Sequence, residues 1–289
     1  CVSLATKEAM GEKYQLLTSF YLILAVFFGP VAVLLIAADF VQEYFPSLNL
    51  SILTLAIYII TYCLLLVKID FLGKLMLIVS SAVAVIFLLS SILILTQTQT
   101  FTFVFPQVEI DKLGYSFLLI FWSIVGWEVI GNYSNDVKDT KTLKSAVVFS
   151  ASAVSVIYFL ITLAICFANF PLKETESFKL IWLIQPLFGA YSTIILASIS
   201  LILCIGTLIL FVGGVARLIS ALSHKKSNFL TKKTSKYLKN GSPIGSLNLL
   251  AAIHMITLYL VYEKVLNLDN LVAFADGFFI ANALIGLVT

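Results

Sequence analysis

Long uncharged segments restrict the fold of this chain more than any other feature of its sequence. One of them, residues 180–216, contains no Asp, Glu, Lys or Arg, and a helix needs about 20 apolar residues to cross a bilayer. Segment lengths and helix breakers predict eight spans, at about 15–40, 49–67, 71–95, 115–135, 144–168, 191–217, 243–262 and 270–289. We therefore expect a single all-α polytopic membrane domain over residues 1–289, embedded in the lipid bilayer.

The composition agrees with this class and excludes several others. Hydrophobic residues make up 61% of the chain and charged residues 11%, with a mean hydropathy of +1.06, which is more apolar than a soluble domain requires. The sequence has no glycine-rich nucleotide-binding motif, no P-loop and no paired catalytic residues. We therefore expect neither an intramembrane enzyme nor a protein driven by ATP, and no cofactor or metal.

The cysteines and the chain ends carry little further information. Cys1, Cys63, Cys166 and Cys204 are far apart, without the spacing of a metal site or a disulfide framework. The last three lie inside predicted spans, where we expect small apolar core residues. The chain begins at Cys1 without a recognisable signal peptide and ends at Thr289 in a hydrophobic segment, so we expect a fragment of a longer membrane protein.

Basic residues predict the orientation, because they concentrate in cytoplasmic connections. If the N-terminal end is inside and the spans alternate, fourteen of the 18 Lys and Arg residues lie inside and four outside. The inside set is Lys7, Lys13, Lys68, Lys74, Lys138, Lys141, Lys144, Arg217, Lys225, Lys226, Lys232, Lys233, Lys236 and Lys239, and the outside set is Lys112, Lys173, Lys179 and Lys264. We expect a cell-membrane protein with this end cytoplasmic, and the net charge of +3 then reflects topology rather than a nucleic-acid partner.

Three segments depart from plain membrane helices. Gly29 and Pro30 predict a kink near the middle of the first span. The connection TQTQTFTFVFPQVEIDKLG alternates polar and aromatic residues, which is typical of a strand, although an irregular loop is an alternative. The stretch over residues 178–188 is apolar, but Pro186 interrupts it and Gly189 follows it. This pattern predicts a short helix or a re-entrant segment on the outer side.

Three acids lie within predicted spans, where an acid costs about 2.5–3.5 kcal/mol to insert. Asp39 and Asp276 lie near span ends, so an interfacial position and a functional one are both open. Glu128 lies deeper, because thirteen residues, or about 20 Å of helix, separate it from Tyr115. A functional or paired role is the stronger expectation for Glu128.

Glycines flank that acid in the segment FWSIVGWEVIGNYSNDVKDTKT, residues 121–142. Gly126 and Gly131 each weaken a helix by about 1 kcal/mol relative to alanine. A discontinuous helix exposes free backbone groups that bind the charged ends of a zwitterion. The alternative is simple glycine packing between helices.

Two other sets of polar residues have ordinary explanations. His254 is isolated in the seventh predicted span, where a hydrogen-bonded core histidine is a simpler expectation than a proton relay. Hydroxyls in several spans suit sodium, but membrane helices commonly use hydroxyls for packing. The hydroxyl set is Ser80, Ser81, Ser90, Ser91, Ser198, Ser200 and Thr207.

Several of these motifs resemble the amino acid–polyamine–organocation permeases. Gly126-Trp127-Glu128, Asn132 and the segment DVKD at 136–139 are similar to the sixth-helix signature of that family, with Thr140 in place of the usual proline. GGVARLISALS followed by SPIGSLNLL is similar to the eighth helix, which an Arg ends, and to the start of the ninth. The resemblance covers nearly the whole chain and equates the eight predicted spans with family helices three to ten.

This resemblance implies a LeuT-like inverted-repeat fold, truncated at both ends, and a set of site residues. Trp122 would be an aromatic lid over the substrate, and Glu128 a proton-sensitive acid behind the site. The unwound backbone would receive the substrate amino group, and Asn132 and Asp276 would act with Glu128 in proton coupling or gating. The implied substrate-binding set is Trp122, Ser123, Ile124, Val125 and Gly126.

The function implied is secondary transport of amino acids or related amines by alternating access, as a proton-coupled symporter or an exchanging antiporter. The alternative is an amino-acid sensor or channel on the same fold, without net transport. Labelled amino acids that bind but never accumulate or exchange would favour the sensor. Identity of the amino acid, coupling ion, and oligomeric state are not specified by the sequence.

Overall fold

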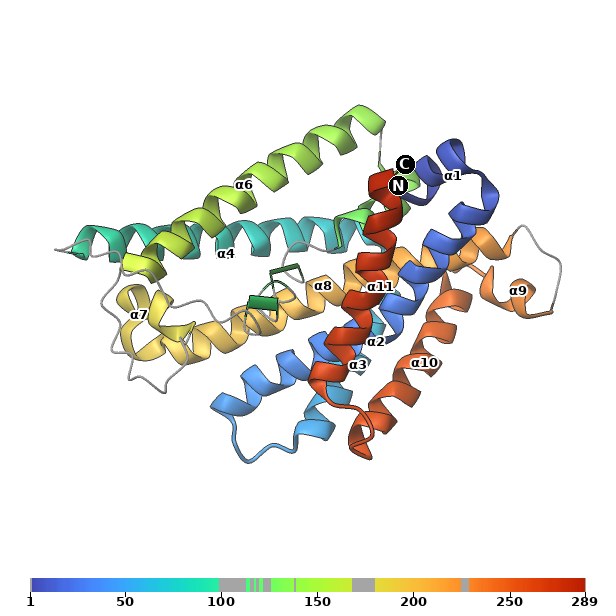
Figure 1. Cartoon of the computed structure of the whole chain (residues 1–289). Helices are drawn as coiled ribbons and strands as arrows, with labels where there is room; N and C mark the ends of the chain where they lie inside the picture. Colours follow the sequence, from blue (N-terminus) through green and yellow to red (C-terminus); the bar gives the residue numbers. More distant parts are fainter. Residues whose placement is uncertain are drawn as a thin grey trace.

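The computed structural model describes residues 2–98, 113–114, 117, 120–121, 126–137, 139–167, 180–224 and 229–288. Regular structure in these ranges is entirely helical (Figure 1). In chain order the elements are α1 (Val2–Met10), α2 (Glu12–Tyr44), α3 (Leu50–Leu65), α4 (Ile69–Gln97), the 3₁₀ helix η1 (Trp127–Asp136), α6 (Thr140–Phe167), α7 (Ile181–Phe188), the 3₁₀ turn η2 (Gly189–Tyr191), α8 (Ser192–Ser223), α9 (Phe229–Thr234), α10 (Ile244–Tyr262) and α11 (Leu268–Val288).

The length and apolar character of these helices confirm the all-α membrane class. Six helical stretches of the described chain are long and apolar enough to cross a bilayer, and α3 is a shorter apolar helix. The six are Glu12–Tyr44, Asp70–Gln97, Lys141–Phe167, Ile181–Ser223, Ile244–Tyr262 and Leu268–Val288. Helices overlap seven of the eight predicted spans, but the span predicted at 115–135 is only partly described, and its described end is η1. The individual crossings stay predictions.

Local sequence explains how two of the helices begin. Asn49 caps α3, because its side-chain oxygen accepts hydrogen bonds from the backbone N–H groups of Ser51, at 3.0 Å, and Ile52, at 3.3 Å. Asp139 does the same at the start of α6, where its carboxylate accepts the N–H of Thr142 at 2.6 Å. Both side chains replace hydrogen bonds that the first turn of a helix cannot make internally.

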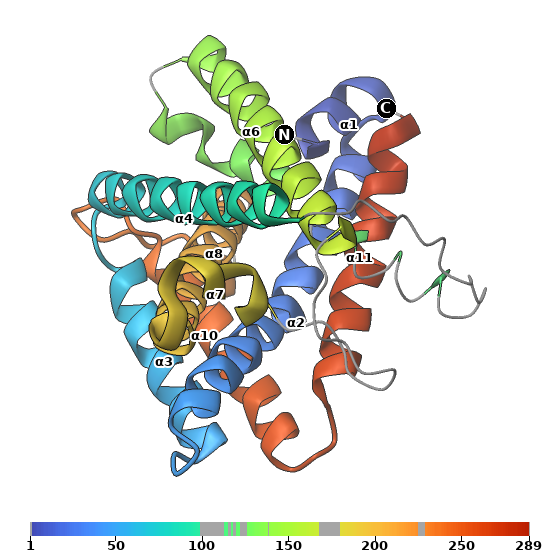
Figure 2. The ribbon, with the colours of Figure 1, turned by 90° about the vertical axis from the view of Figure 1, so that its left-hand side faces the viewer.

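Helices α2 and α8 form the centre of the arrangement. Helix α2 runs beside α11 in both views and packs against α3, α8 and α10 (Figures 1 and 2). Helix α8 contacts α2, α3, α10 and η1, while α4 and α6 pair with each other to one side (Figure 2). The two helices therefore connect nearly every part of the described fold.

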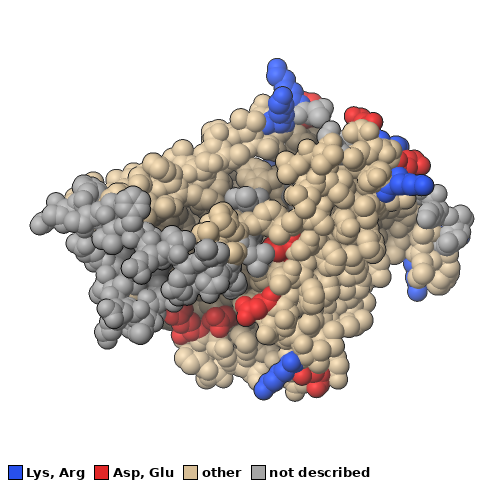
Figure 3. Space-filling model, in the orientation of Figure 1, with Lys and Arg blue, Asp and Glu red and all other residues tan. Residues whose placement is uncertain are grey.

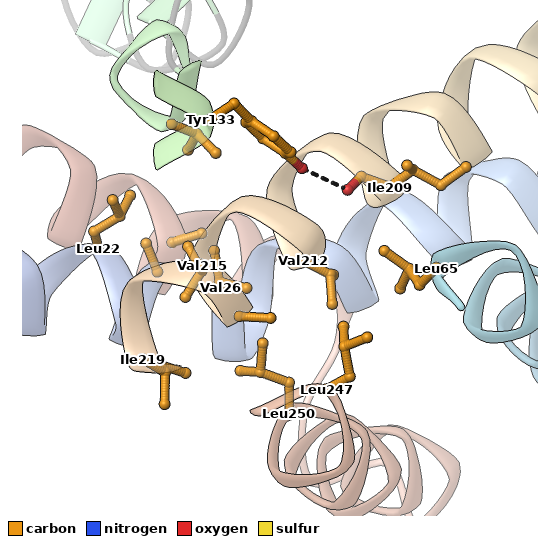
Figure 4. Close-up of a cluster of buried hydrophobic side chains, with 14 of the residues drawn as sticks. Leu22, Val26, Leu65, Tyr133, Ile209, Val212, Val215, Ile219, Leu247 and Leu250 are labelled. Carbon is orange, nitrogen blue, oxygen red and sulfur yellow. Dashed lines mark hydrogen bonds between the residues drawn. The ribbon is translucent and has the colours of Figure 1, made fainter. Parts of the chain in front are cut away.

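The main core lies where α8 meets its neighbours (Figure 4). Val212, Val215 and Ile219 of α8 pack among buried side chains of α2, η1, α10 and α11. Those buried partners include Leu22, Val26, Tyr133, Leu247, Leu250, Ala275 and Phe279. Burial of each large apolar side chain contributes about 1.5–3 kcal/mol relative to exposure in water, although in lipid the gain comes from packing rather than from removal of water.

The outer faces of the helices are apolar, as a bilayer requires. On the face in Figure 3, uncharged surface covers most of the described helices, and Lys and Arg gather at its margins. Cys63 and Cys166 are exposed on α3 and α6, so the prediction that they are core residues is wrong. They lie on outward helix faces, where a thiol is apolar enough to meet lipid. Cys204 is partly buried in α8.

Other expectations have mixed outcomes. The short helix expected before the sixth span is α7, which contains Pro186 and is followed by Gly189. Helix α2 continues through Pro30 to Tyr44, and Asp39 is exposed near its end, as an interfacial acid would be. Helix α8 does not end at Arg217, because it continues to Ser223. Residues 99–112, with the strand-like alternation, lie outside the described residues.

Candidate functional site

The backbone changes conformation at Gly126. Phe121 is helical, Gly126 has a φ of 110° and a ψ of −12°, and the 3₁₀ helix η1 follows from Trp127 to Asp136. A positive φ of this kind is open to glycine and costs other residues about 1–2 kcal/mol. Runs of 3₁₀ helix longer than three or four residues are uncommon and often mark a hinge. An α-helix therefore does not continue through the Gly-Trp-Glu motif.

The side of Gly126 that lacks a side chain is filled by Phe211 of α8. A Cβ built on Gly126 would collide with the Phe211 ring, and Gly126 itself is buried. The aromatic ring thus packs directly on backbone at the break. Two requirements, the left-handed conformation and this contact, both select glycine at position 126.

Phe211 also connects the break to α11. Its ring meets that of Phe279 edge to face, with centroids 5.9 Å apart. Asp276 lies three residues before Phe279, within one turn of α11. The break and the buried acid therefore lie on two elements that meet at the same ring of α8.

Asp276 is fully buried, with 0% of its surface exposed. Within the described part of the chain neither of its carboxyl oxygens has a hydrogen-bond partner. Two aromatic pairs place it along α2: Phe274 packs on Phe28 at 5.2 Å, and Phe278 stacks on Tyr21 at 6.3 Å. The acid therefore lies at the level of the middle of α2, away from either helix end. A buried carboxyl without partners is costly and is a candidate for function.

A pocket of about 310 Å³ opens beside the break, between η1, α6 and α8. Gly126, Trp127 and Ile130 form one wall, and Phe211 forms another. The remaining lining residues are Leu143, Ala146, Val147, Ser150 and Leu210. The lining is almost entirely apolar, and the volume lies at the lower end of the range of about 300–1,000 Å³ found for small-molecule sites.

The structure brings together only part of the predicted site set. Trp122, Ser123, Ile124 and Val125 lie outside the described residues. Glu128 is in η1, and its side chain is likewise outside what is described; Asn132 is partly buried in the same helix. Gly126 and Asp276 are both placed, and Phe211 lies between their elements.

Sequence reasoning missed the residues that attach η1 to α8. The Tyr133 hydroxyl donates to the carbonyl oxygens of Leu210, at 2.9 Å, and Ile209, at 3.2 Å (Figure 4). A Cβ on Gly213 would come within 2.8 Å of that hydroxyl, and one on Gly214 within 3.0 Å of the Tyr133 ring. Adjacent small residues in a membrane helix indicate a close approach, so the Gly213-Gly214 pair was the available signal.

Arg217 of α8 also packs on Tyr133. Its guanidinium lies 4.7 Å from the centre of the Tyr133 ring and donates a hydrogen bond to the carbonyl of Gly213 at 3.1 Å. A cation over an aromatic face stabilises by about 0.5–2 kcal/mol. Together with the Tyr133 hydrogen bonds, this contact fixes the 3₁₀ helix on α8 just beyond the break.

Four of the seven hydroxyls considered for sodium have local partners, whereas the buried Ser90 hydroxyl has none among the described residues. Ser80, Ser91, Ser198 and Thr207 each donate to a backbone carbonyl three or four residues earlier in their own helix. Ser80, Ser198 and Thr207 are also exposed on the helix surface. These bonds are the ordinary pattern of hydroxyls in membrane helices and lend no support to a sodium site.

A comparison of the sequence with models of known families decides the class. The model described as amino acid permease matches residues 2–289, which is almost the whole chain. The chain belongs to the amino acid permease family. The family membership agrees with the resemblance to the amino acid–polyamine–organocation permeases and with the apolar helices of the fold.

One curated relative is similar over part of this permease. The L-methionine/branched-chain amino acid exporter YjeH of Escherichia coli (strain K12) is 22% identical over 177 residues. The match covers 60% of the present chain and 41% of the relative. No solved structure matches the chain significantly.

Proposed function

We propose that this permease is a secondary transporter of amino acids or related amines, which works by alternating access. The observation that carries the proposal is the left-handed break at Gly126, which adjoins an apolar pocket and packs on Phe211. The Phe211 ring also meets α11, whose buried Asp276 has no hydrogen-bond partner among the described residues. Broken membrane helices expose backbone groups that bind the carboxylate and ammonium of a zwitterion. The proposal includes a cell-membrane location with the N-terminal end of the chain in the cytoplasm.

The site residues keep the roles that the family resemblance implies. The backbone of residues 123–126 receives the substrate amino group, and Trp122 covers the substrate. Glu128, Asn132 and Asp276 respond to protons or to gating. Transport is then proton-coupled or proceeds by exchange, and an acid that can be neutralised inside the bilayer is the chemical requirement for proton coupling.

The pocket favours substrates with apolar side chains. Trp127, Val147 and Phe211 offer hydrocarbon and aromatic surface, and the Ser150 hydroxyl is the main polar side-chain group among the lining residues. A charged side chain would lose its hydration there without gaining a partner. The name of the Escherichia coli relative, which refers to methionine and branched-chain amino acids, fits the same chemistry.

Ligand-induced stabilisation of the purified full-length protein tests the substrate class. A ligand that binds the folded state raises the melting temperature with its concentration. We expect L-methionine, L-leucine and L-isoleucine to raise it, and L-lysine and L-glutamate to leave it unchanged at equal concentration. Stabilisation by the charged amino acids alone would contradict the apolar side-chain assignment. Binding without accumulation in proteoliposomes would favour a sensor instead.

A further inference from the structure

Helix α2 contains a proline at its centre, and the proline leaves one backbone carbonyl without its usual donor. In an α-helix the N–H of residue 30 would donate to the carbonyl of residue 26. Pro30 has no N–H, and its ring crowds the carbonyl four residues earlier. Val26 and Pro30 are both buried, with Val26 0% exposed. An unpaired carbonyl at this depth would be costly, because neither lipid nor apolar side chains can donate a hydrogen bond to it.

His254 of α10 supplies a donor to this carbonyl. Its Nε2 lies 2.7 Å from the Val26 carbonyl oxygen. A carbonyl only accepts, so Nε2 carries the proton. The other ring nitrogen, Nδ1, lies 3.2 Å from the hydroxyl of Tyr58 in α3. In a neutral ring with the proton on Nε2, Nδ1 accepts, and the Tyr58 hydroxyl therefore donates to it.

The hydrogen-bond partners that the described residues offer to the His254 ring are both uncharged. His254 is 0% exposed and Tyr58 is 6% exposed, and their rings meet edge to face with centroids 5.7 Å apart. The polar groups that the structure places against the imidazole are the Val26 carbonyl and the Tyr58 hydroxyl. Both hydrogen-bonding positions of the ring are thereby occupied, one as donor and one as acceptor.

We propose that His254 is a positioning residue that replaces the hydrogen bond lost at Pro30 and so holds α2, α3 and α10 together as one unit. The imidazole is neutral and carries its proton on Nε2. The Val26 carbonyl, which can only accept, selects that tautomer. The Tyr58 hydroxyl then donates to Nδ1. His254 is then a fixed structural donor, in contrast to the proton relay that an intramembrane histidine commonly suggests.

The same contact positions α2 against α11. Phe28 lies two residues beyond Val26, and its ring packs on Phe274 and Phe278 of α11, with centroids 5.2 Å and 6.4 Å apart. Asp276 lies between these two phenylalanines in sequence. A change in the course of α2 at Val26–Pro30 would therefore reach the helix that carries the buried acid. The inference concerns the fold and stands without the proposed transport function.

A double-mutant cycle tests the link between His254 and Pro30. Pro30→Ala restores an N–H that can donate to the Val26 carbonyl. We expect His254→Ala to lower the melting temperature of the full-length protein in nanodiscs by roughly 5 °C. In the Pro30→Ala background the same substitution should lower it clearly less, because the carbonyl then has an internal partner. Equal losses in both backgrounds would mean that His254 only fills space, and would overturn the proposal.

A spectroscopic measurement decides the tautomer without disturbing the fold. The chain has two histidines, His224 and His254, and His224 is exposed at the end of α8, where it stacks on Tyr237. His224→Gln therefore serves as a control for stability and removes the other imidazole signal of residues 1–289. Nitrogen-15 NMR at pH 7 should find a neutral ring protonated on Nε2. A ring protonated on Nδ1, or an imidazolium, would overturn the proposal even if His254→Ala failed to fold.

Discussion

The ring of Phe211 occupies the space that a side chain on Gly126 would require, so α8 packs directly on the backbone at the point where the chain turns left-handed. The contact gives the break two independent causes, one conformational and one steric. A residue of α8 therefore supports the backbone conformation at the Gly-Trp-Glu motif.

Gly126→Ala should destabilise the protein by at least about 1 kcal/mol, because alanine is strained at this φ and its Cβ meets Phe211. Thermal unfolding of the purified protein measures the loss. Gly73→Ala is the matched control, because a Cβ there meets no atom within 4 Å and the residue lies within helix α4. A loss for Gly126→Ala no larger than that for Gly73→Ala would contradict the steric argument.

Tyr133→Phe should cost about 1 kcal/mol, because it removes the hydroxyl that bonds two α8 carbonyls, and interhelical hydrogen bonds in membranes contribute about 0.6–1.7 kcal/mol. Chemical denaturation in mixed micelles measures the change. Tyr259→Phe on α10, where the side chain is 60% exposed, should stay within about 0.5 kcal/mol of the wild type. The attachment of η1 to α8 would be in doubt if both variants behaved alike.

Asp276→Leu should raise stability and abolish proton-dependent transport. Asp276 is buried and has no hydrogen-bond partner among the described residues, so an apolar side chain of similar size removes a penalty of roughly 1–3 kcal/mol. A gain in stability with a loss of activity is the mark of a residue retained for function. Melting temperature and uptake are measured side by side, with Asp269→Asn, an exposed acid at the start of the same helix, as the control. Unchanged uptake in Asp276→Leu would remove this acid from the site.

Asp139 should make the start of α6 sensitive to acid. The backbone N–H of Thr142, which donates to its carboxylate, lowers the pKa of Asp139 below its ordinary value of 3.8. A depressed pKa contributes stability that is complete above about 3.8 and is lost as the pH falls through the lower folded value. Hydrogen exchange at the Thr142 amide should therefore accelerate below pH 4.

Asp139→Asn is the control for that effect, because its amide oxygen can still cap the helix and does not titrate. Exchange in this variant should lose the acid-dependent step. An acid-dependent step of the same size in Asp139→Asn would assign the titration to another group.

The helices could be predicted from sequence because apolar length and helix breakers are local properties. The uncharged stretch that includes α8 exceeds what a span needs, and Pro186 with Gly189 separates α7 from it. Gly126 was predicted as a break for the same reason, since glycine weakens a helix locally. These predictions needed no knowledge of which helices meet.

The contacts around the site could not be predicted, because they join residues far apart in the chain. Phe211 lies 85 positions after Gly126, and Tyr133 bonds carbonyls 76 and 77 positions away. The partner of His254 depends on the absence of a donor at Pro30, which is visible only once α10 is placed against α2. Exposure of Cys63 and Cys166 likewise depends on which helix faces are covered.

The most direct test of the central claim is counterflow in proteoliposomes that contain the full-length protein and an excess of unlabelled L-leucine inside. Labelled L-leucine outside should accumulate transiently above its equilibrium level, and Trp122→Ala and Glu128→Gln should each reduce that accumulation strongly. Binding of the label without accumulation, whether or not a pH gradient is imposed, would contradict alternating-access transport.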